Sequence, residues 1–248
     1  AYTSGVISNN DVIIIRLAEE QTKKIDLPEG IFEFDPKIEG NAYWQDNRTI
    51  IFEPVGLLPS NVSFKGIFHL KEIINVPDEL AEFHFEFKTK PLFAELSTKG
   101  IESYSNTDLT WNILNGELIL SDYADIEKIE QALSVSQNGV QKNVRWTHNE
   151  DLNTHLFTVD SIKREEKTSY VEISLDEDVL PTVNQLQEKV KIPGINDFSV
   201  LNIVVKQSPD QIVYVYFSDP IDPNQDLNGL IYFESGEDIK LSVEGNAV

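Results

Sequence analysis

Short runs of β-branched and aromatic residues recur along this chain, and turn-forming residues separate them. Residues 12–17 (VIIIRL) are a continuous apolar run, which is typical of a buried strand. Residues 81–87 (AEFHFEF) alternate apolar and polar side chains, and residues 211–217 (QIVYVYF) have the same strand-forming composition. Turn signals come about every 8–12 residues. This rhythm predicts an all-β chain of tandem Ig-like antiparallel β-sandwiches, of the fibronectin III or macroglobulin-like kind.

The first part of the chain holds enough runs for one sandwich. Its central stretch, residues 43–64, has the pattern of strand, polar turn, strand, loop and strand. Pro54 and Pro59 bracket the loop, because a proline cannot donate to a sheet ladder. The strands expected here are residues 12–17, 31–34, 38–44, 49–52, 62–70 and 81–87.

The second part combines strand signals with one helix signal, near residues 122–133. Ser121 or Asp122 is placed to cap this helix, and acidic residues follow in its first turn. Residues 163–167 (KREEK) predict a charged turn between strands. Three apolar residues fall on one face of the helix, namely Ile126, Ile129 and Leu133. The strands expected here are residues 109–113, 117–120, 144–146, 155–159, 170–175 and 190–192.

Two proline-bounded segments, at residues 88–91 and 189–193, suggest domain boundaries. We therefore expect an Ig-like sandwich over residues 1–91 and a macroglobulin-like sandwich with the short helix over residues 92–195. Residues 196–248 are expected to start a third, incomplete sandwich. Its predicted strands are residues 200–206, 211–217, 230–233 and 239–243.

A weak internal repeat supports this division. The strand-to-loop junctions at residues 17–19 (LAE), 120–122 (LSD) and 217–219 (FSD) look equivalent. They lie roughly one hundred residues apart, which is the size of one sandwich domain.

The charge and composition exclude several classes of function. The net charge is −22, which argues against nucleic acid as a partner and against docking on anionic lipid. Without cysteine the chain has no disulfide, thiolate nucleophile or Cys-ligated zinc. No apolar run approaches the roughly 20 residues that a membrane-spanning helix needs. Methionine is also absent, including at position 1, which suggests a fragment of a longer protein.

One group of residues has the side chains that commonly bind metals. His148, Glu150, Asp151 and His155 lie close together in the sequence, and a hairpin could bring the two histidines near each other. No zinc-protease pattern is present, and no third fixed ligand is evident. The favoured interpretation is a solvated hairpin turn, with no metal and no cofactor.

Oxygen-bearing side chains also alternate at Asp222, Asn224, Asp226 and Asn228, as they do in calcium loops. Aligned on Asn224, the twelfth loop position is Ser235, where a bidentate glutamate is needed. A turn stabilised by Asx and proline chemistry is therefore favoured over a calcium site.

The three tryptophans, Trp44, Trp111 and Trp146, could form a sugar-stacking platform, but each lies in or beside an apolar strand. Packing in a core or between domains is the favoured interpretation. The sequence contains no nucleophile elbow, no P-loop and no dinucleotide-binding fingerprint, so no enzyme activity is expected.

Several long segments resemble the amino-terminal region of bacterial α2-macroglobulins, especially the large forms of Bacteroidetes. The resemblance is carried by residues 4–20 (SGVISNNDVIIIRLAEE) and 32–64, and further by residues 145–174 and 217–231 (FSDPIDPNQDLNGLI). The first domain separately resembles the bacterial Ig-like domains of surface-layer proteins.

The resemblance implies a broad-spectrum endopeptidase inhibitor of the periplasm or cell envelope, often a lipoprotein. In such a protease trap a bait region is cut, the molecule collapses around the protease, and in many members a thioester captures it. Without cysteine this chain cannot carry that thioester, so it would be a scaffold segment. Its partners would be proteases, met through the full-length protein, and other domains of the same chain. Membrane contact would come only through a lipid anchor outside this chain.

Two alternatives remain open from the sequence. One is the Ig-like repeat region of a cell-surface adhesin or S-layer-type protein, which would contain many further copies of the module. The other is a carbohydrate-binding module, which would need exposed, coplanar tryptophans.

Overall fold

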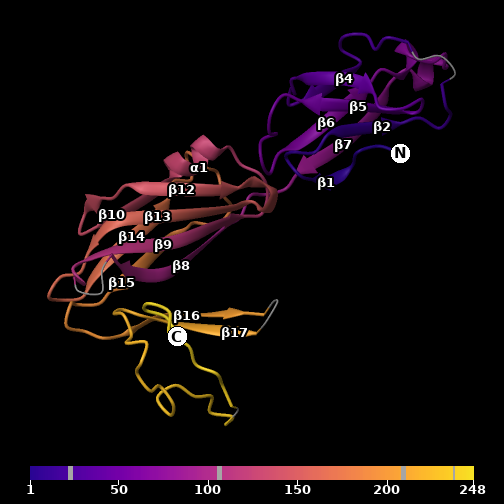
Figure 1. Ribbon diagram of the computed structural model, residues 1–248. Helices are drawn as coiled ribbons and strands as arrows, with labels where there is room; N and C mark the ends of the chain where they lie inside the picture. The colour runs from indigo at the N-terminus through magenta and orange to yellow at the C-terminus, as the bar shows by residue number, and fades with distance from the viewer. Residues whose placement is uncertain (22–24, 105–107, 208–210, 237) are drawn as a thin grey trace. The chain divides into compact units, whose positions relative to one another are not determined.

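The computed structural model describes residues 1–21, 25–104, 108–207, 211–236 and 238–248 (Figure 1). The all-β fold expected from the sequence is confirmed, since antiparallel sheets dominate both of the compact units into which the chain divides. The first unit comprises Ala1–Phe93, Leu120–Asp125 and Pro181–Val183, and the second comprises Ala94–Ile119, Ile126–Leu180 and Asn184–Val248.

The first unit is an Ig-like sandwich of two sheets. Its strands follow the predicted runs to within a few residues, and β1 is an addition that the sequence did not reveal. Strand β1 pairs with the last strand, β7, in parallel, and every other pairing in the unit is antiparallel. One sheet has the order β1 (Gly5–Ile7), β7 (Phe83–Thr89), β6 (Ser63–Phe68), β3 (Phe32–Asp35), and the other β2 (Ile13–Arg16), β5 (Thr49–Pro54), β4 (Gly40–Trp44). The 3-10 turns η1 (Leu70–Glu72) and η2 (Asp78–Leu80) join β6 to β7.

Aromatic rings fill the core of this sandwich. Phe32 lies between Phe52 and Phe68, with ring centroids 5.4 and 4.9 Å away. Gly66 faces Phe85 across the β6–β7 pair, and a Cβ at Gly66 would lie 2.3 Å from the Phe85 ring. The glycine therefore makes room for a phenylalanine on the neighbouring strand.

The second unit contains an eight-stranded sandwich of two four-stranded sheets (Figure 1). Five of its strands, β9, β12, β13, β14 and β15, overlap predicted runs, whereas β8, β10 and β11 were not anticipated, because their sequences are short or rich in polar residues. One sheet has the order β12 (Val144–Asn149), β13 (Thr154–Lys163), β9 (Trp111–Leu120), β8 (Ala94–Ser103). The other has the order β11 (Val140–Gln141), β10 (Leu133–Gln137), β14 (Ser169–Leu175), β15 (Gln187–Ile192).

The predicted break between residues 109–113 and 117–120 is wrong, because both runs belong to the single strand β9. Asn115-Gly116 has a turn-like composition, yet Gly116 stays in the strand and pairs with Phe157 of β13. A Cβ at Gly116 would lie 2.1 Å from the Phe157 ring. As at Gly66, the glycine marks a close approach of an aromatic ring and not a turn.

The helix is present but shorter than predicted. It is α1 (Ile126–Ala132), which buries Ile129 and Ala132. The expected cap is wrong, because Ser121 and Asp122 lie at least four residues before its first residue. Leu133, expected on the helix face, is instead the first residue of β10.

Residues 184–248 all belong to the second unit. They include a hairpin of β16 (Val200–Lys206) and β17 (Ile212–Phe217), as expected. The strands predicted at residues 230–233 and 239–243 are wrong, since these segments are irregular apart from one isolated bridge at Ile231. A strand forms only where a neighbouring backbone supplies its hydrogen bonds, and apolar composition alone does not supply them.

Candidate functional site

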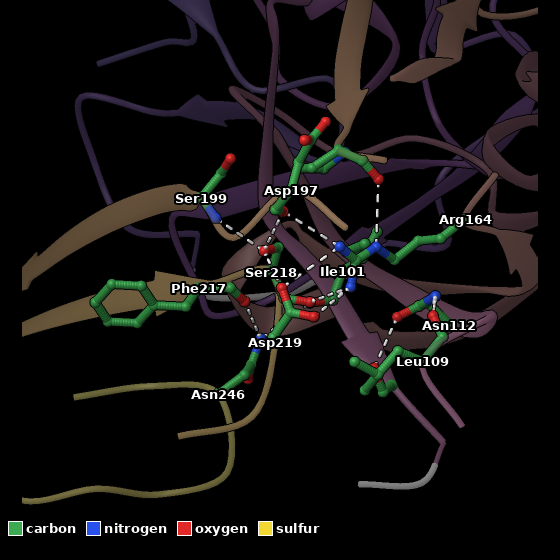
Figure 2. A network of polar contacts seen from close by, with 12 residues as sticks. Ile101, Leu109, Asn112, Arg164, Asp197, Ser199, Phe217, Ser218, Asp219 and Asn246 are labelled. Atoms are coloured by element: carbon green, nitrogen blue, oxygen red, sulfur yellow. Dashed lines mark hydrogen bonds and ion pairs between the residues drawn. The ribbon is translucent and has the colours of Figure 1, made fainter. Parts of the chain in front are cut away.

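A buried arginine lies at the centre of the most extensive polar network in the described residues (Figure 2). Arg164 directly follows β13 and is 1% exposed. The charged turn predicted for KREEK does connect two strands, β13 and β14, but the sequence did not reveal that Arg164 is buried in it. A guanidinium ion is costly to bury unless its N–H groups find acceptors, so its partners decide whether the site is stable.

Four backbone carbonyls accept hydrogen bonds from this guanidinium. Nη2 donates to Gly194 O at 2.7 Å and Nη1 donates to Ser218 O at 3.0 Å. Nε donates to Pro193 O and Nη2 also reaches Asp197 O, both at 3.3 Å. Arg164 therefore joins the end of β13, the segment after β15 and the end of β17.

Asp219 balances the buried charge. Its Oδ1 lies 2.8 Å from Arg164 Nη1, and its Oδ2 lies 3.4 Å from Nη2. The arginine side chain of this pair is fully buried and that of Asp219 is mostly buried. Charge-assisted bonds of this kind are stronger than neutral ones and fix the direction of both side chains.

Ser218 extends the network to the start of β16 (Figure 2). Its Oγ accepts the backbone N–H of Ser199 at 3.0 Å and donates to Asp197 O at 3.1 Å. The hydroxyl also contacts the Asp219 carboxylate, and its single proton serves one of these two acceptors at a time. Ser218 thus links the residue before β16 to the residue after β17, at the open end of the hairpin.

Three further contacts attach the hairpin region to β8. Asn202 Nδ2 donates to Thr98 O at 2.6 Å, and Asn246 Nδ2 donates to Ile101 O at 3.0 Å. Gly100, with φ +81°, lies against the side chain of Leu201, and a Cβ there would be 2.9 Å from Leu201 Cβ. Together with Arg164 these contacts form a continuous joint between the eight-stranded sandwich and the β16–β17 hairpin.

The first unit contains the same serine geometry. Ser121 Oγ accepts the N–H of Phe93 at 2.8 Å and donates to Pro91 O at 3.2 Å, as Ser218 does with Ser199 and Asp197. At each junction the serine also donates its own backbone N–H to the same partner residue. Ser121 N–H donates to Phe93 O, and Ser218 N–H donates to Ser199 O. The sequence repeat at the two Ser-Asp junctions is therefore a structural repeat as well.

Asp122 is buried in the first unit and does not cap the helix. Its Oδ1 accepts a hydrogen bond from Ser8 Oγ at 2.5 Å, and its Oδ2 accepts the N–H of Asn9 at 2.9 Å. At both junctions the aspartate after the serine thus accepts bonds from a segment remote in sequence.

The four residues with metal-binding side chains are only partly brought together. His148 and His155 lie opposite each other on β12 and β13, with their Nδ1 atoms 2.9 Å apart. His148 Nε2 lies 3.1 Å from Glu130 Oε1 of α1. Glu150 and Asp151 are exposed in the 3-10 turn η3 (Glu150–Leu152), away from this chain of bonds. The predicted hairpin is confirmed, since β12 and β13 bring the two histidines together. The predicted solvated turn is wrong for them, because both lie in strands and His155 is buried.

One choice of tautomers agrees with the hydrogen bonds of this histidine pair. His155 is 3% exposed, and no described group bonds to its Nε2. The other three ring nitrogens of the pair all have hydrogen-bond partners if His155 Nδ1–H donates to His148 Nδ1 and His148 Nε2–H donates to Glu130. Burial lowers the pKa of His155, and the neighbouring His148 lowers it further. Across the described ranges, no three His, Asp or Glu side chains gather as a metal site would require.

The residues of the calcium alternative form two successive Asx turns. Asp222 Oδ1 accepts the N–H of Asn224 at 2.9 Å, and Asp226 Oδ1 accepts the N–H of Asn228 at 3.0 Å. Each carboxylate oxygen therefore accepts a hydrogen bond from the backbone N–H two residues further along the chain, as in the predicted Asx turns.

The tryptophans share no stacking face within the second unit. Trp146 pairs with Phe157, whose partner on β9 is Gly116, so these three residues face the core. Trp111 is five residues from Gly116 along the same strand and faces the opposite side, where it is 44% exposed. Of the two kinds of packing predicted for Trp111, in a core or between domains, packing in the core is thus wrong. Trp44, in the first unit, packs against that unit's core and donates Nε1–H to Ile25 O at 3.0 Å.

Comparison with known proteins adds little to this description. No family model matches the chain, and no curated protein matches it. One solved structure, an L,D-transpeptidase from Mycobacterium tuberculosis H37Rv, is similar at 10% identity with a TM-score of 0.27, over 86% of this chain and 71% of that one. A likeness this weak carries no argument about fold or activity. The described residues form no helix that is long and apolar enough to cross a membrane.

Proposed function

We propose that this chain is a scaffold segment of a bacterial α2-macroglobulin-like protease inhibitor, whose reactive regions lie outside these residues. The segment belongs to an extracytoplasmic protein of the periplasm or cell envelope, lipid-anchored in its full-length form. The segment itself is not an enzyme and uses no cofactor. The resemblance of several long sequence segments motivates this proposal, together with the Ig-like architecture.

The observation that carries the proposal is the joint around Arg164. A scaffold that must hold a protease trap in shape needs stiff connections between successive modules, because flexible connections dissipate any shape change. A buried guanidinium with an aspartate and four carbonyls as partners is such a connection. Its bonds are directional and shielded from water, so they resist bending more than exposed contacts do.

The test uses the natural protein that contains this chain, purified from its source cells. It is incubated with a serine endopeptidase and, separately, with a metallo-endopeptidase. Cleavage of casein and of a small chromogenic peptide is then measured. A trap encloses the protease without blocking its active site, so casein cleavage should fall several-fold while peptide cleavage persists. The matched control is the 248-residue chain alone, which should change neither rate.

Two outcomes contradict the proposal. If the natural protein leaves casein cleavage unchanged with both proteases, the trap function is wrong. If the chain alone inhibits, the reactive region lies within it. The adhesin or S-layer alternative predicts no effect on either protease and many further Ig-like modules in the natural protein. The carbohydrate-binding alternative is disfavoured, because Trp111 and Trp146 lie on opposite faces of their sheet.

A further inference from the structure

Strand β8 lies at the edge of its sheet, with β9 on one side and no strand of that sheet on the other. It spans ten residues, from Ala94 to Ser103, whereas the other edge strands of the described sheets span seven or fewer. The free side of an edge strand presents a row of unpaired N–H and C=O groups, which can pair with a strand of another molecule. A long free edge of this kind therefore needs some form of closure.

Two hydrogen bonds at the ends of the β8–β9 hairpin show which backbone groups of β8 point to the free side. Ser121 N–H donates to Phe93 O, and Tyr104 N–H donates to Trp111 O. Phe93 and Tyr104 thus both face β9, yet one position is odd-numbered and the other even-numbered, whereas strand groups on one side recur at every second residue. One extra residue lies between them, and Gly100, with φ +81°, has the left-handed backbone of a β-bulge. The free side therefore takes even-numbered residues before Gly100 and odd-numbered residues after it.

The side chain of Asn184 covers the first of these free-side positions. Its Nδ2 donates to Ala94 O at 2.7 Å, and its Oδ1 accepts the Ala94 N–H at 3.0 Å. A side-chain amide that exchanges both bonds with one residue imitates the pairing that a neighbouring strand would make. Ala94 is thereby closed to any other strand.

Two more asparagines cover later positions on the same side. Asn202 Nδ2 donates to Thr98 O, and Asn246 Nδ2 donates to Ile101 O. Thr98 is even-numbered and precedes Gly100, whereas Ile101 is odd-numbered and follows it. Both carbonyls therefore point to the free side, and the positions of these bonds agree with the bulge.

The three asparagine contacts leave little of the edge free. Of the free-side positions from Ala94 to Ile101, only Leu96 has no hydrogen bond with a described asparagine. Strands in globular proteins usually pair over about five or six residues. One open position is therefore too short for a partner strand to pair with β8.

We propose that Asn184, Asn202 and Asn246 close the free edge of β8 against antiparallel pairing with β8 of a second copy of this chain. Each side-chain amide supplies the hydrogen-bond partner that a neighbouring strand would otherwise offer, so the edge is satisfied without one. The chain thereby keeps its longest described edge strand from joining two molecules.

The charges of β8 favour a second copy as the partner that is kept out. Paired antiparallel about Ser97, two β8 strands place Leu96 of each copy opposite Thr98 of the other, and both are free-side positions that can exchange ladder bonds. The same register places Glu95 opposite Lys99 twice, once for each copy, and both side chains are exposed. Opposite charges at facing positions stabilise such a pair, and the twofold arrangement closes on itself.

The net charge of −22 also keeps copies apart, but by a different mechanism. Salt screens this long-range repulsion, so at high ionic strength it no longer prevents association. The asparagine hydrogen bonds act at contact distance on the strand edge and persist in salt. The two mechanisms can therefore be separated by raising the salt concentration.

The experiment follows self-association of the 248-residue chain by sedimentation velocity at increasing protein concentration, in about 0.5 M NaCl. The unchanged chain should keep a single sedimentation coefficient. Asn184→Ala combined with Asn202→Ala opens the edge from residue 94 to residue 98, so the coefficient should rise with concentration toward that of a dimer. A double variant that stays monomeric overturns the proposal, and so does an unchanged chain that dimerises to the same extent.

Charge reversal shows whether the dimer forms through β8. Added to the double variant, Lys99→Glu sets like charges opposite each other and should weaken the dimer about tenfold or more. Adding Glu95→Lys as well restores opposite charges and should restore the dimer. Lys167→Glu, at an exposed position of the charged turn, changes the net charge by the same amount as Lys99→Glu and should leave the dimer intact. A dimer that is insensitive to the charges at Lys99 and Glu95 forms elsewhere, which overturns the proposal.

The single variant Asn202→Ala supplies a second reading if the double variant loses its fold. It frees Thr98, so Leu96 and Thr98 can pair across two copies while Asn184 still holds Ala94. Far-ultraviolet circular dichroism establishes that each variant keeps its β structure. A folded single variant that stays monomeric overturns the proposal in the same way. None of these readings involves a protease, so they stand or fall separately from the proposed function.

Discussion

At the scale of single residues, Arg164 has the largest structural consequence. Asp219 neutralises its charge, and backbone carbonyls accept hydrogen bonds from its N–H groups. The guanidinium can therefore be buried only while the aspartate and these carbonyls are all in place. Two of those carbonyls, Pro193 and Gly194, follow β15, so the same side chain also closes one end of the sandwich.

Replacing Arg164 by methionine should lower the free energy of unfolding of the second unit by about 3–5 kcal/mol, because Asp219 and several carbonyls lose their donor. Urea denaturation, followed by the fluorescence of Trp111 and Trp146 in a Trp44→Phe background, measures this change. The matched control is Arg145→Met, which breaks an exposed ion pair with Asp160 and should cost less than about 1 kcal/mol. Equal costs for the two variants would contradict the role assigned to Arg164.

His155 should make stability depend on pH. Its folded pKa is lowered, first by burial and then by His148. The unfolded chain has an ordinary histidine pKa of about 6.5, so below that pH it binds a proton that the folded chain refuses. The free energy of unfolding should therefore be full above about pH 6.5 and decrease as the pH falls below it.

Denaturation between pH 7.5 and 5.5 measures this effect. His155→Leu removes the titrating group while keeping the site filled, and should flatten the dependence. His84→Gln, at an exposed histidine of the first unit, should leave it unchanged. A slope that persists in His155→Leu would show that other groups cause it.

At the scale of elements, the glycines in the strands explain why turn signals can mislead. Asn115-Gly116 has the composition of a turn, but a strand continues through it because the Phe157 ring occupies the space over Gly116. The partner that makes the glycine necessary lies 41 positions away in the sequence. No local pattern contains that information.

The two Ser-Asp junctions allow a matched comparison of one set of hydrogen bonds. Ser218→Ala should lower the free energy of unfolding by about 1–3 kcal/mol, because the N–H of Ser199 loses its acceptor at a site where Ser218 itself is buried. Ser121→Ala removes the same bonds at an exposed position, where water replaces the hydroxyl, so its cost should stay below about 1 kcal/mol. Urea denaturation measures both. A larger loss at Ser121 would contradict the argument that burial sets the cost.

At the scale of the whole molecule, the acidic character of the chain invites the idea of calcium binding. The net charge of −22 attracts divalent ions without requiring any specific site. In the segment with alternating oxygen ligands, Asp222 and Asp226 already accept backbone hydrogen bonds.

We therefore expect the unfolding temperature to be the same in a chelator and in millimolar calcium. Differential scanning calorimetry measures it, and magnesium at equal concentration controls for general screening of charge. A rise with calcium that magnesium does not reproduce, and that Asp226→Asn abolishes, would establish a specific site in this segment.

The sequence by itself determined the all-β fold and the positions of most strands, because alternation and β-branched runs are local properties that each strand carries alone. It also revealed the Ser-Asp repeat and the hairpin that brings His148 to His155. The tertiary structure decided where polar and apolar side chains end up: that Arg164 of a charged run is buried, that Trp111 is exposed, and that residues 230–233 and 239–243 remain irregular. Burial and strand formation depend on partners remote in the sequence, and a strand sequence without a neighbouring backbone has nothing to pair with.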